Sequence, residues 1–111
     1  MIRQRLDELL ATIDGVQIVG HAEDADAAIA EILDTRPDAV VLDLKLTRGT
    51  GFDVLRAVHR DAPAIDVYML TNHAAEPYRR VAMDLGARGF FDKSTEMDRI
   101  RDALAACAVR H

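Results

Sequence analysis

The stretch that most constrains this sequence is the uncharged run from Ala39 to Leu42, which leads directly into Asp43 and then Leu44. A short apolar run rich in valine is typical of a strand buried on both faces, as in a parallel sheet. Asp43 is therefore predicted at the carboxyl end of a central strand, the edge where open α/β sheets bind their ligands. A carboxylate there can act as a nucleophile, a metal ligand or a helix cap.

Apolar residues elsewhere recur with helical spacing or in short extended runs. The helical spacing predicts five helices: 2–13, Asp24 to Thr35, Phe52 to about Arg60, one from Pro77 that ends before Gly86, and one from about Thr95 onward. The extended runs predict strands at 16–19, 39–43, 65–70 and 89–91, the last ending at Asp92-Lys93. Strands that alternate with helices indicate right-handed βαβ units and a parallel sheet covered on both faces. The predicted fold is one α/β domain over residues 1–111, in the order αβαβαβαβα.

Composition narrows the class of protein further. The length of 111 residues suits a single core, and the net charge of −5 argues against a nucleic-acid surface. The sequence contains no apolar run near the roughly 18 residues that a membrane span needs, and its start does not resemble a signal peptide. The lone Cys107 cannot form an internal disulfide. We therefore expect a cytoplasmic protein that does not enter membranes.

Three of the four predicted strands end in polar side chains of different chemistry, namely Asp43, Thr71 and Lys93. The carboxyl ends of parallel strands meet at one edge of the sheet, so we expect these side chains to converge. A carboxylate could attack phosphorus and form an acyl phosphate. A hydroxyl could donate a hydrogen bond to a phosphoryl oxygen, and an ammonium group could neutralise its charge. The combination predicts a site for phosphoryl transfer to Asp43.

The same positions carry a resemblance to a known family. The segment 40–44 (Val-Val-Leu-Asp-Leu), the pair Leu70-Thr71 and the segment 86–94 (Gly-Ala-Arg-Gly-Phe-Phe-Asp-Lys-Ser) resemble the receiver domain of bacterial two-component response regulators. The resemblance runs over essentially the whole chain, and the spacing between the three segments fits as well. It implies a flavodoxin-like fold and a role in signal transduction rather than an enzyme activity.

The resemblance also implies individual roles. Asp43 would be the phosphoacceptor, Thr71 the switch hydroxyl, Lys93 the lysine that pairs with the phosphate, and Phe90 the switch aromatic residue. Gly51 matches the glycine that closes the loop after the phosphoacceptor.

Several of these residues also have simpler interpretations. Asp43 could be a strand-end aspartate that accepts backbone hydrogen bonds, and Lys93 could form a structural ion pair with it. Thr71 could cap the following helix. Lys45 and His73 lie two residues beyond Asp43 and Thr71, at positions that in receivers influence the lifetime of the phosphate, but each could equally be a solvated loop residue.

Two features depart from the family pattern. Thr47 stands where receivers usually have a proline, which affects only the stiffness of the loop. More seriously, receivers begin with a strand that ends in a pair of acidic residues, whereas Met1 already falls within the first predicted helix. Phosphoryl transfer in receivers depends on Mg²⁺, and Asp43 without the acidic pair would bind it weakly. Glu23 and Asp24 could substitute, although carboxylates just before a helix are more often caps.

The missing strand also bears on the sheet. In the receiver order 2-1-3-4-5, its loss would leave the strand at 16–19 without a neighbour. Each buried unpaired peptide group costs about 1–3 kcal/mol, against a total stability of about 5–15 kcal/mol. Either this strand pairs directly with the strand at 39–43, or a second copy of the chain covers the exposed edge. We predict the second arrangement, a homo-oligomer.

The leading functional hypothesis is a stand-alone receiver that accepts a phosphoryl group on Asp43 from a sensor histidine kinase or a phosphotransfer protein. It would signal through protein contacts made by the fourth helix, the strand of Phe90 and the last helix. The alternative is a pseudo-receiver that cannot be phosphorylated and acts as an interaction or dimerisation module. A nucleotide- or flavin-binding protein of the same fold is disfavoured, because Gly49-Thr50-Gly51 lacks the third glycine and the lysine of a phosphate-binding loop.

Overall fold

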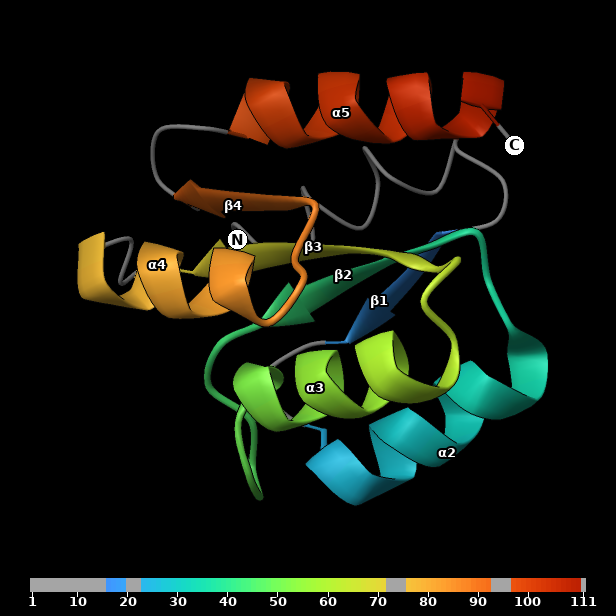
Figure 1. Ribbon diagram of the computed structural model, residues 1–111, viewed down its shortest axis with the longest axis vertical. Helices are drawn as coiled ribbons and strands as arrows, with labels where there is room; N and C mark the ends of the chain where they lie inside the picture. Colours follow the sequence, from blue (N-terminus) through green and yellow to red (C-terminus); the bar gives the residue numbers. More distant parts are fainter. Residues whose placement is uncertain (1–15, 20–22, 72–75, 93–96, 111) are drawn as a thin grey trace.

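The computed structural model describes residues 16–19, 23–71, 76–92 and 97–110, in which strands and helices alternate along the chain (Figure 1). The predicted helix over 2–13 lies outside these residues. The described elements are β1 (Val16–Val19), α2 (Ala25–Thr35), β2 (Ala39–Asp43), α3 (Gly51–Asp61), β3 (Asp66–Thr71), α4 (Glu76–Asp84), β4 (Gly89–Asp92) and α5 (Met97–Arg110). The predicted α/β class is confirmed, and each predicted strand lies within a residue or two of its observed bounds.

The four strands form one parallel sheet in the order β1-β2-β3-β4. Strand β1 pairs directly with β2, from Val16 opposite Ala39 to Val19 opposite Leu42. Of the two arrangements considered from the sequence, direct pairing is the one observed, so the predicted open gap between these strands was wrong, whereas a homo-oligomer stays a prediction. Pairing within the chain joins the facing backbone groups of both strands, so no second copy is needed to satisfy them.

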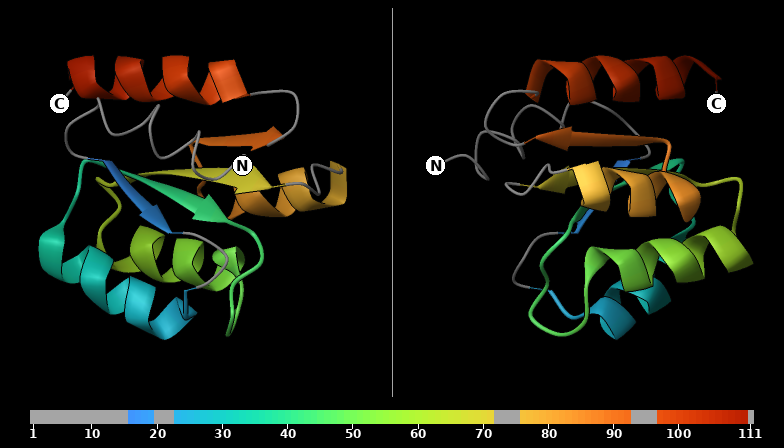
Figure 2. Two further views of the ribbon diagram at one scale, coloured as in Figure 1. Left: turned by 180° about the vertical axis from the view of Figure 1, so that it is seen from behind. Right: turned by 60° about the vertical axis from the view of Figure 1, so that its left-hand side comes forward.

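Helices cover both faces of the sheet, as predicted, with α2, α3 and α4 on one face and α5 on the other (Figures 1 and 2). On the first face Ile32, Leu55, Met69 and Phe90 belong to one buried cluster. On the second face α5 buries Ile100 and Leu104 in a cluster whose other members are Ala39, Val41, Tyr68 and Leu70. Alternate residues of each strand therefore enter opposite clusters, as a strand buried on both faces requires. The side chains of Met97 and Cys107, predicted to pack with them, lie outside the described residues.

The helix ends follow signals that are visible in the sequence. The Asp24 side chain caps α2 by accepting from the backbone N–H groups of Asp26 and Ala27. Helix α4 ends in the pattern expected of a C-terminal glycine, because Gly86 has a φ of +102° and the N–H of Ala87 reaches back to the carbonyl of Ala82. These ends determine where the loops between helices and strands begin.

Candidate functional site

Among the described residues, two polar side chains are buried, and they belong to the last residues of two neighbouring strands at the carboxyl edge of the sheet. Asp43 is 9% exposed and Thr71 is 1% exposed. They are the last residues of the neighbouring strands β2 and β3, and Asp43 is paired in register with Leu70, one residue before Thr71. Burying polar groups costs free energy unless they are hydrogen-bonded. The concentration of both at one edge therefore marks it as the candidate site.

The backbone after β2 folds back over Asp43. The Asp43 Oδ1 atom accepts a hydrogen bond from the backbone N–H of Lys45 at 3.1 Å, and the N–H of Gly51 donates to the carbonyl of Leu44 at 2.8 Å. Gly51 is buried, and a Cβ atom there would collide with the carbonyl oxygen of Asp43 and the side chain of Met69. This close approach explains why a glycine occupies position 51.

The outer part of the same loop lies against the start of α2. The N–H of Thr47 donates to the carbonyl of Glu23, and the N–H of Ala25 donates to the carbonyl of Arg48, both at 2.9 Å. Residues 23–25 therefore contact the part of the loop that lies four or five residues beyond Asp43. Asp24 itself caps α2 at 2.8 Å from the N–H of Asp26. This geometry favours the cap over the metal-ligand role considered for Asp24.

The same residues decide how well a metal ion fits. Receiver domains generally bind Mg²⁺ at the phosphorylation site. Within the described part of the chain, no group of three or more His, Cys, Asp and Glu side chains is arranged to hold a metal ion. Asp43 is the only acidic side chain buried among the described residues. The described residues therefore do not fit a Mg²⁺ site built on an acidic pair.

Phe90 and Arg79 form a second feature close to this edge. Phe90 lies in β4, 2% exposed, and pairs in register with Met69 of β3. The guanidinium group of Arg79, from α4, lies over the Phe90 ring with its Cζ atom 5.2 Å from the ring centroid, and its Nη1 donates to the carbonyl of Phe90 at 3.0 Å. This contact was not predicted, because an arginine on an amphipathic helix usually lies in solvent.

Of the remaining predicted site residues, the structure describes only Lys45. Lys93 and His73 lie outside the residues that the structure describes, so their roles stay predictions. The side chain of Lys45 is exposed, and its backbone pairs with Thr50 across the loop.

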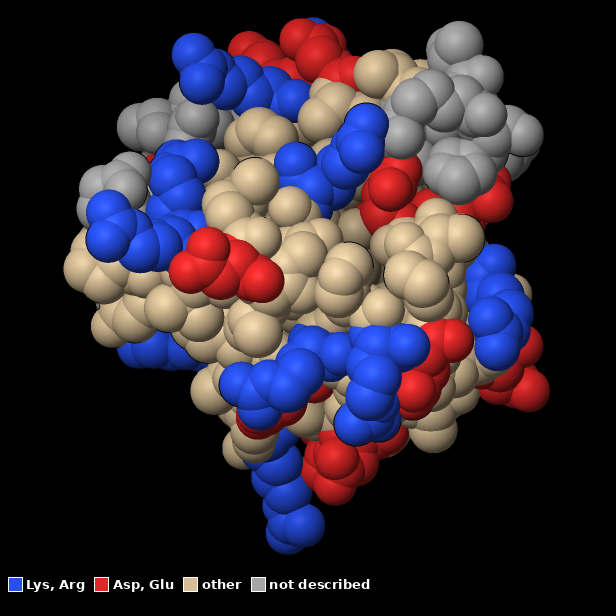
Figure 3. All heavy atoms as spheres, in the orientation of Figure 1, with Lys and Arg blue, Asp and Glu red and all other residues tan. Residues whose placement is uncertain are grey.

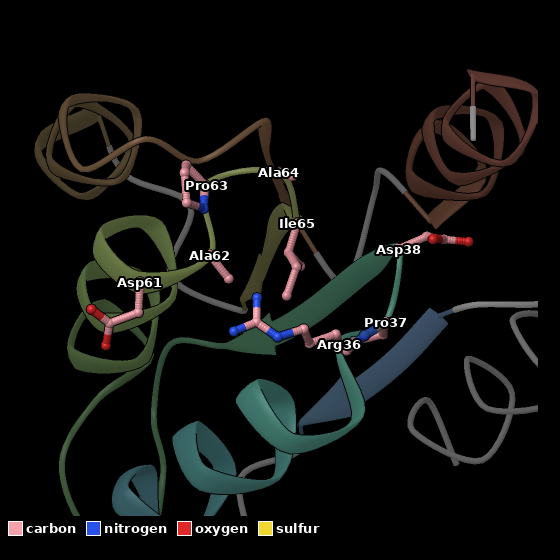
Figure 4. A pocket seen from close by; sticks show the side chains of 8 residues that line it. All are labelled: Arg36, Pro37, Asp38, Asp61, Ala62, Pro63, Ala64 and Ile65. Atoms are coloured by element: carbon pink, nitrogen blue, oxygen red, sulfur yellow. The ribbon is translucent and has the colours of Figure 1, made fainter.

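A cavity of about 320 Å³ lies at the opposite, amino edge of the sheet (Figure 4). Its lining comes from the end of α3 and from the loops before β2 and β3, and it includes Arg36, Asp38, Asp61, Ala62 and Ile65. A hydrogen bond from the exposed Arg60 lowers the pKa of the Asp61 carboxyl. None of the predicted site residues lines this cavity, so it is separate from the candidate site.

Within the described part of the chain, the surface carries mixed charge, and its large exposed apolar side chains lie on one helix. On the face shown in Figure 3, basic and acidic side chains are interspersed among uncharged ones. The three large apolar side chains that are exposed among the described residues are Tyr78 (44%), Val81 (43%) and Met83 (46%), all on α4. Of the helices described, none has the length and apolar character that crossing a bilayer demands.

The parallel sheet, its helical layers and the buried Asp43 and Thr71 define a flavodoxin-like domain with a candidate site at the carboxyl edge. Residues 1–105 match the response regulator receiver domain, and the chain belongs to this family. Because the match covers nearly the whole chain, the predicted family is confirmed.

Individual relatives agree with this assignment. The chain is 27% identical over 104 residues to the response regulator GacA of Pseudomonas viridiflava, covering 94% of this chain and 49% of that protein. It is 33% identical over 94 residues to a protein-glutamate methylesterase/protein-glutamine glutaminase of Geobacter sulfurreducens, covering 85% of this chain and 25% of that protein. The crystal structure of a LuxR-family two-component response regulator from Aurantimonas sp. SI85-9A1 superposes with a TM-score of 0.81 at 26% identity, covering 99% of this chain and 79% of that one. The chain thus spans about half the length of the first relative and a quarter of the second.

Proposed function

We propose that this chain is a phospho-accepting receiver in which Asp43 takes a phosphoryl group from a sensor histidine kinase or a phosphotransfer protein. The observation that carries the proposal is the burial of both Asp43 and Thr71 at the carboxyl ends of the neighbouring strands β2 and β3. Membership of the receiver family supports it.

The chemistry follows from the groups at this edge. A carboxylate oxygen of Asp43 attacks phosphorus, the phosphorus–nitrogen bond of a phosphohistidine breaks, and the leaving imidazole keeps the electron pair and is protonated. The product is an acyl phosphate on Asp43. The N–H of Lys45 orients the carboxylate through its hydrogen bond to Oδ1. Thr71 donates to a phosphoryl oxygen, and Lys93, the residue after β4, offsets the added charge.

The signal leaves through protein contacts rather than through a reaction catalysed by this domain. The proposed contact surface comprises α4, β4 and α5, and the exposed Tyr78, Val81 and Met83 supply apolar area on α4. Tyr78 and Val81 are three positions apart and lie on the same side of the helix, and exposed apolar area is a common feature of interaction surfaces. The partner would be a downstream protein in the cytoplasm.

A pseudo-receiver is the second candidate, and one observation favours it. The described residues offer no three-ligand group for a metal ion, and Asp24 is engaged as a helix cap. A receiver with so few ligands would take up phosphate slowly, and its function would then rest on protein contacts alone.

Phosphoryl uptake separates the two candidates. The protein is incubated with acetyl phosphate and Mg²⁺, and its intact mass is compared with that of Asp43→Asn. Asp38→Asn is the matched control, because Asp38 is an exposed aspartate just before the opposite end of the same strand. We expect one phosphoryl group on the wild type and on Asp38→Asn, and none on Asp43→Asn. Absence of uptake by the folded wild type would favour the pseudo-receiver.

A further inference from the structure

Helix α4 is attached to the rest of the molecule by few of its own side chains. Of those that the structure describes within α4, Ala82 alone is fully buried, and Arg79 is the only other one that is not exposed. Elements with few buried contacts are the ones that open or shift most readily. Any side chain that joins α4 to the sheet therefore has a large share in fixing its position.

Arg79 makes two contacts with the same residue of β4. Its guanidinium lies over the Phe90 ring, with 5.2 Å between Cζ and the ring centroid, and its Nη1 donates to the Phe90 carbonyl at 3.0 Å. Strand β4 is the last in the order of the described sheet, so this carbonyl lies on an edge strand. A planar guanidinium can stack on a ring and donate from its rim at the same time. Arg79 thus covers the Phe90 ring and also donates a hydrogen bond to the carbonyl oxygen of the same residue.

The ring that Arg79 covers lies on the same side of the sheet as Thr71. Phe90 is paired in register with Met69, and both belong to the buried cluster on the α4 side. Thr71 is two residues beyond Met69 in β3, and side chains two apart in a strand point to the same face. The Phe90 ring therefore lies on the same face of the sheet as the Thr71 side chain, at the diagonal position on the neighbouring strand.

We propose that Arg79 is a positioning residue that holds the Phe90 ring buried whether or not Asp43 carries a phosphoryl group. The Phe90 ring is then tied to the position of α4, and displacement of Arg79 by a protein bound at α4 releases it. The link to signalling rests on the proposed function, whereas the burial of the Phe90 ring by Arg79 is a property of the unmodified chain. It can therefore be measured independently of phosphoryl uptake.

The test labels the full chain with 4-fluorophenylalanine and assigns the ¹⁹F resonance of Phe90 with Phe90→Leu. The shift of that resonance between H₂O and D₂O reports how much water reaches the ring. We expect almost no isotope shift in the wild type and a clear one in Arg79→Met, which keeps the length of the side chain but loses the charge and the donors. Arg80→Met is the matched control, because Arg80 is the exposed neighbour on the same helix, and we expect it to behave as the wild type.

An unchanged Phe90 resonance in folded Arg79→Met would overturn the proposal. If Arg79→Met does not fold, Arg79→Gln decides, since it keeps a donor but loses the cation. An isotope shift of Arg79→Gln above that of the wild type supports the proposal that Arg79 keeps the ring buried, and a shift equal to that of the wild type overturns it.

Asp43→Asn separates the hold from the proposed function. We expect the Phe90 resonance of this variant to match that of the wild type, and exposure of the ring would overturn the proposal. After treatment with acetyl phosphate, and with phosphorylation verified by mass, we expect the wild-type resonance to stay in place and that of Arg79→Met to move. Equal movement in both would also overturn it. Failure of phosphoryl uptake would count against Asp43 as phosphoacceptor. The role of Arg79 in burying the ring would still be decided by the spectra of the unphosphorylated wild type and Arg79→Met.

Discussion

Each edge of the sheet has an aspartate beside or within β2, but the two aspartates differ in burial. Strand β2 is preceded by Asp38 at the amino edge and ends with Asp43 at the carboxyl edge, yet Asp38 is exposed and Asp43 is buried. The start of β3 likewise has the half-buried Asp66, and its end has the buried Thr71. A buried polar group must be compensated by hydrogen bonds, whereas an exposed one is satisfied by water. Burial, rather than residue type, therefore distinguishes the candidate site at the carboxyl edge from the amino edge.

The largest difference in stability between the edges is expected from adding one methyl group. Gly51→Ala would place a Cβ against the backbone oxygen of Asp43, which cannot rotate away. We expect a loss of about 1–3 kcal/mol in the free energy of unfolding, despite the higher helix propensity of alanine. Ala64→Val adds atoms at an exposed position of the amino edge and should change stability by less than about 0.5 kcal/mol. Urea unfolding measures the unfolding free energy of both variants. Equal losses in the two variants would show that the carboxyl edge is not packed more tightly than the amino edge.

The start of α2, at the carboxyl edge, offers a smaller effect. Asp24→Ala removes the cap that accepts from Asp26 and Ala27 and should cost about 1 kcal/mol. Asp24→Asn keeps a capping oxygen and should be nearly neutral. Thermal unfolding with and without Mg²⁺ checks both variants. If Asp24→Asn were as unstable as Asp24→Ala, or if it abolished a stabilisation by Mg²⁺, the cap interpretation would be wrong.

The end of α2, at the amino edge, should respond least and in the opposite direction. Arg36 is the only non-glycine residue of the described chain with a positive φ, at 46°. A left-handed conformation costs an L-residue about 1–2 kcal/mol, and glycine avoids this at an entropic cost of about 0.5–1 kcal/mol. Arg36→Gly is therefore expected to raise the unfolding free energy by less than about 1 kcal/mol. Ala30→Gly, at an exposed position inside the same helix, should lower it by about 1 kcal/mol. Loss of stability in Arg36→Gly would contradict this account.

The sequence predicted the fold where local pattern and tertiary environment agree. The apolar run before Asp43 and the similar run before Thr71 required two buried strands, and both residues lie at the ends of those strands. The direct pairing of β1 with β2 was one of two arrangements considered but not the one chosen, because the neighbour of a strand depends on the whole sheet and cannot be determined from a four-residue strand alone. Arg79 was missed for a related reason, since an arginine that folds back onto a strand has the same helical spacing as one in solvent.

The central claim is that Asp43 is the residue that accepts the phosphoryl group, and chemical trapping tests it most directly. After incubation with acetyl phosphate, borohydride reduces an acyl phosphate to an alcohol and leaves free carboxylates intact, so tandem mass spectrometry identifies the residue that was modified. The account predicts reduction at position 43 alone. Reduction at another aspartate, or at none while the protein is folded, would contradict it.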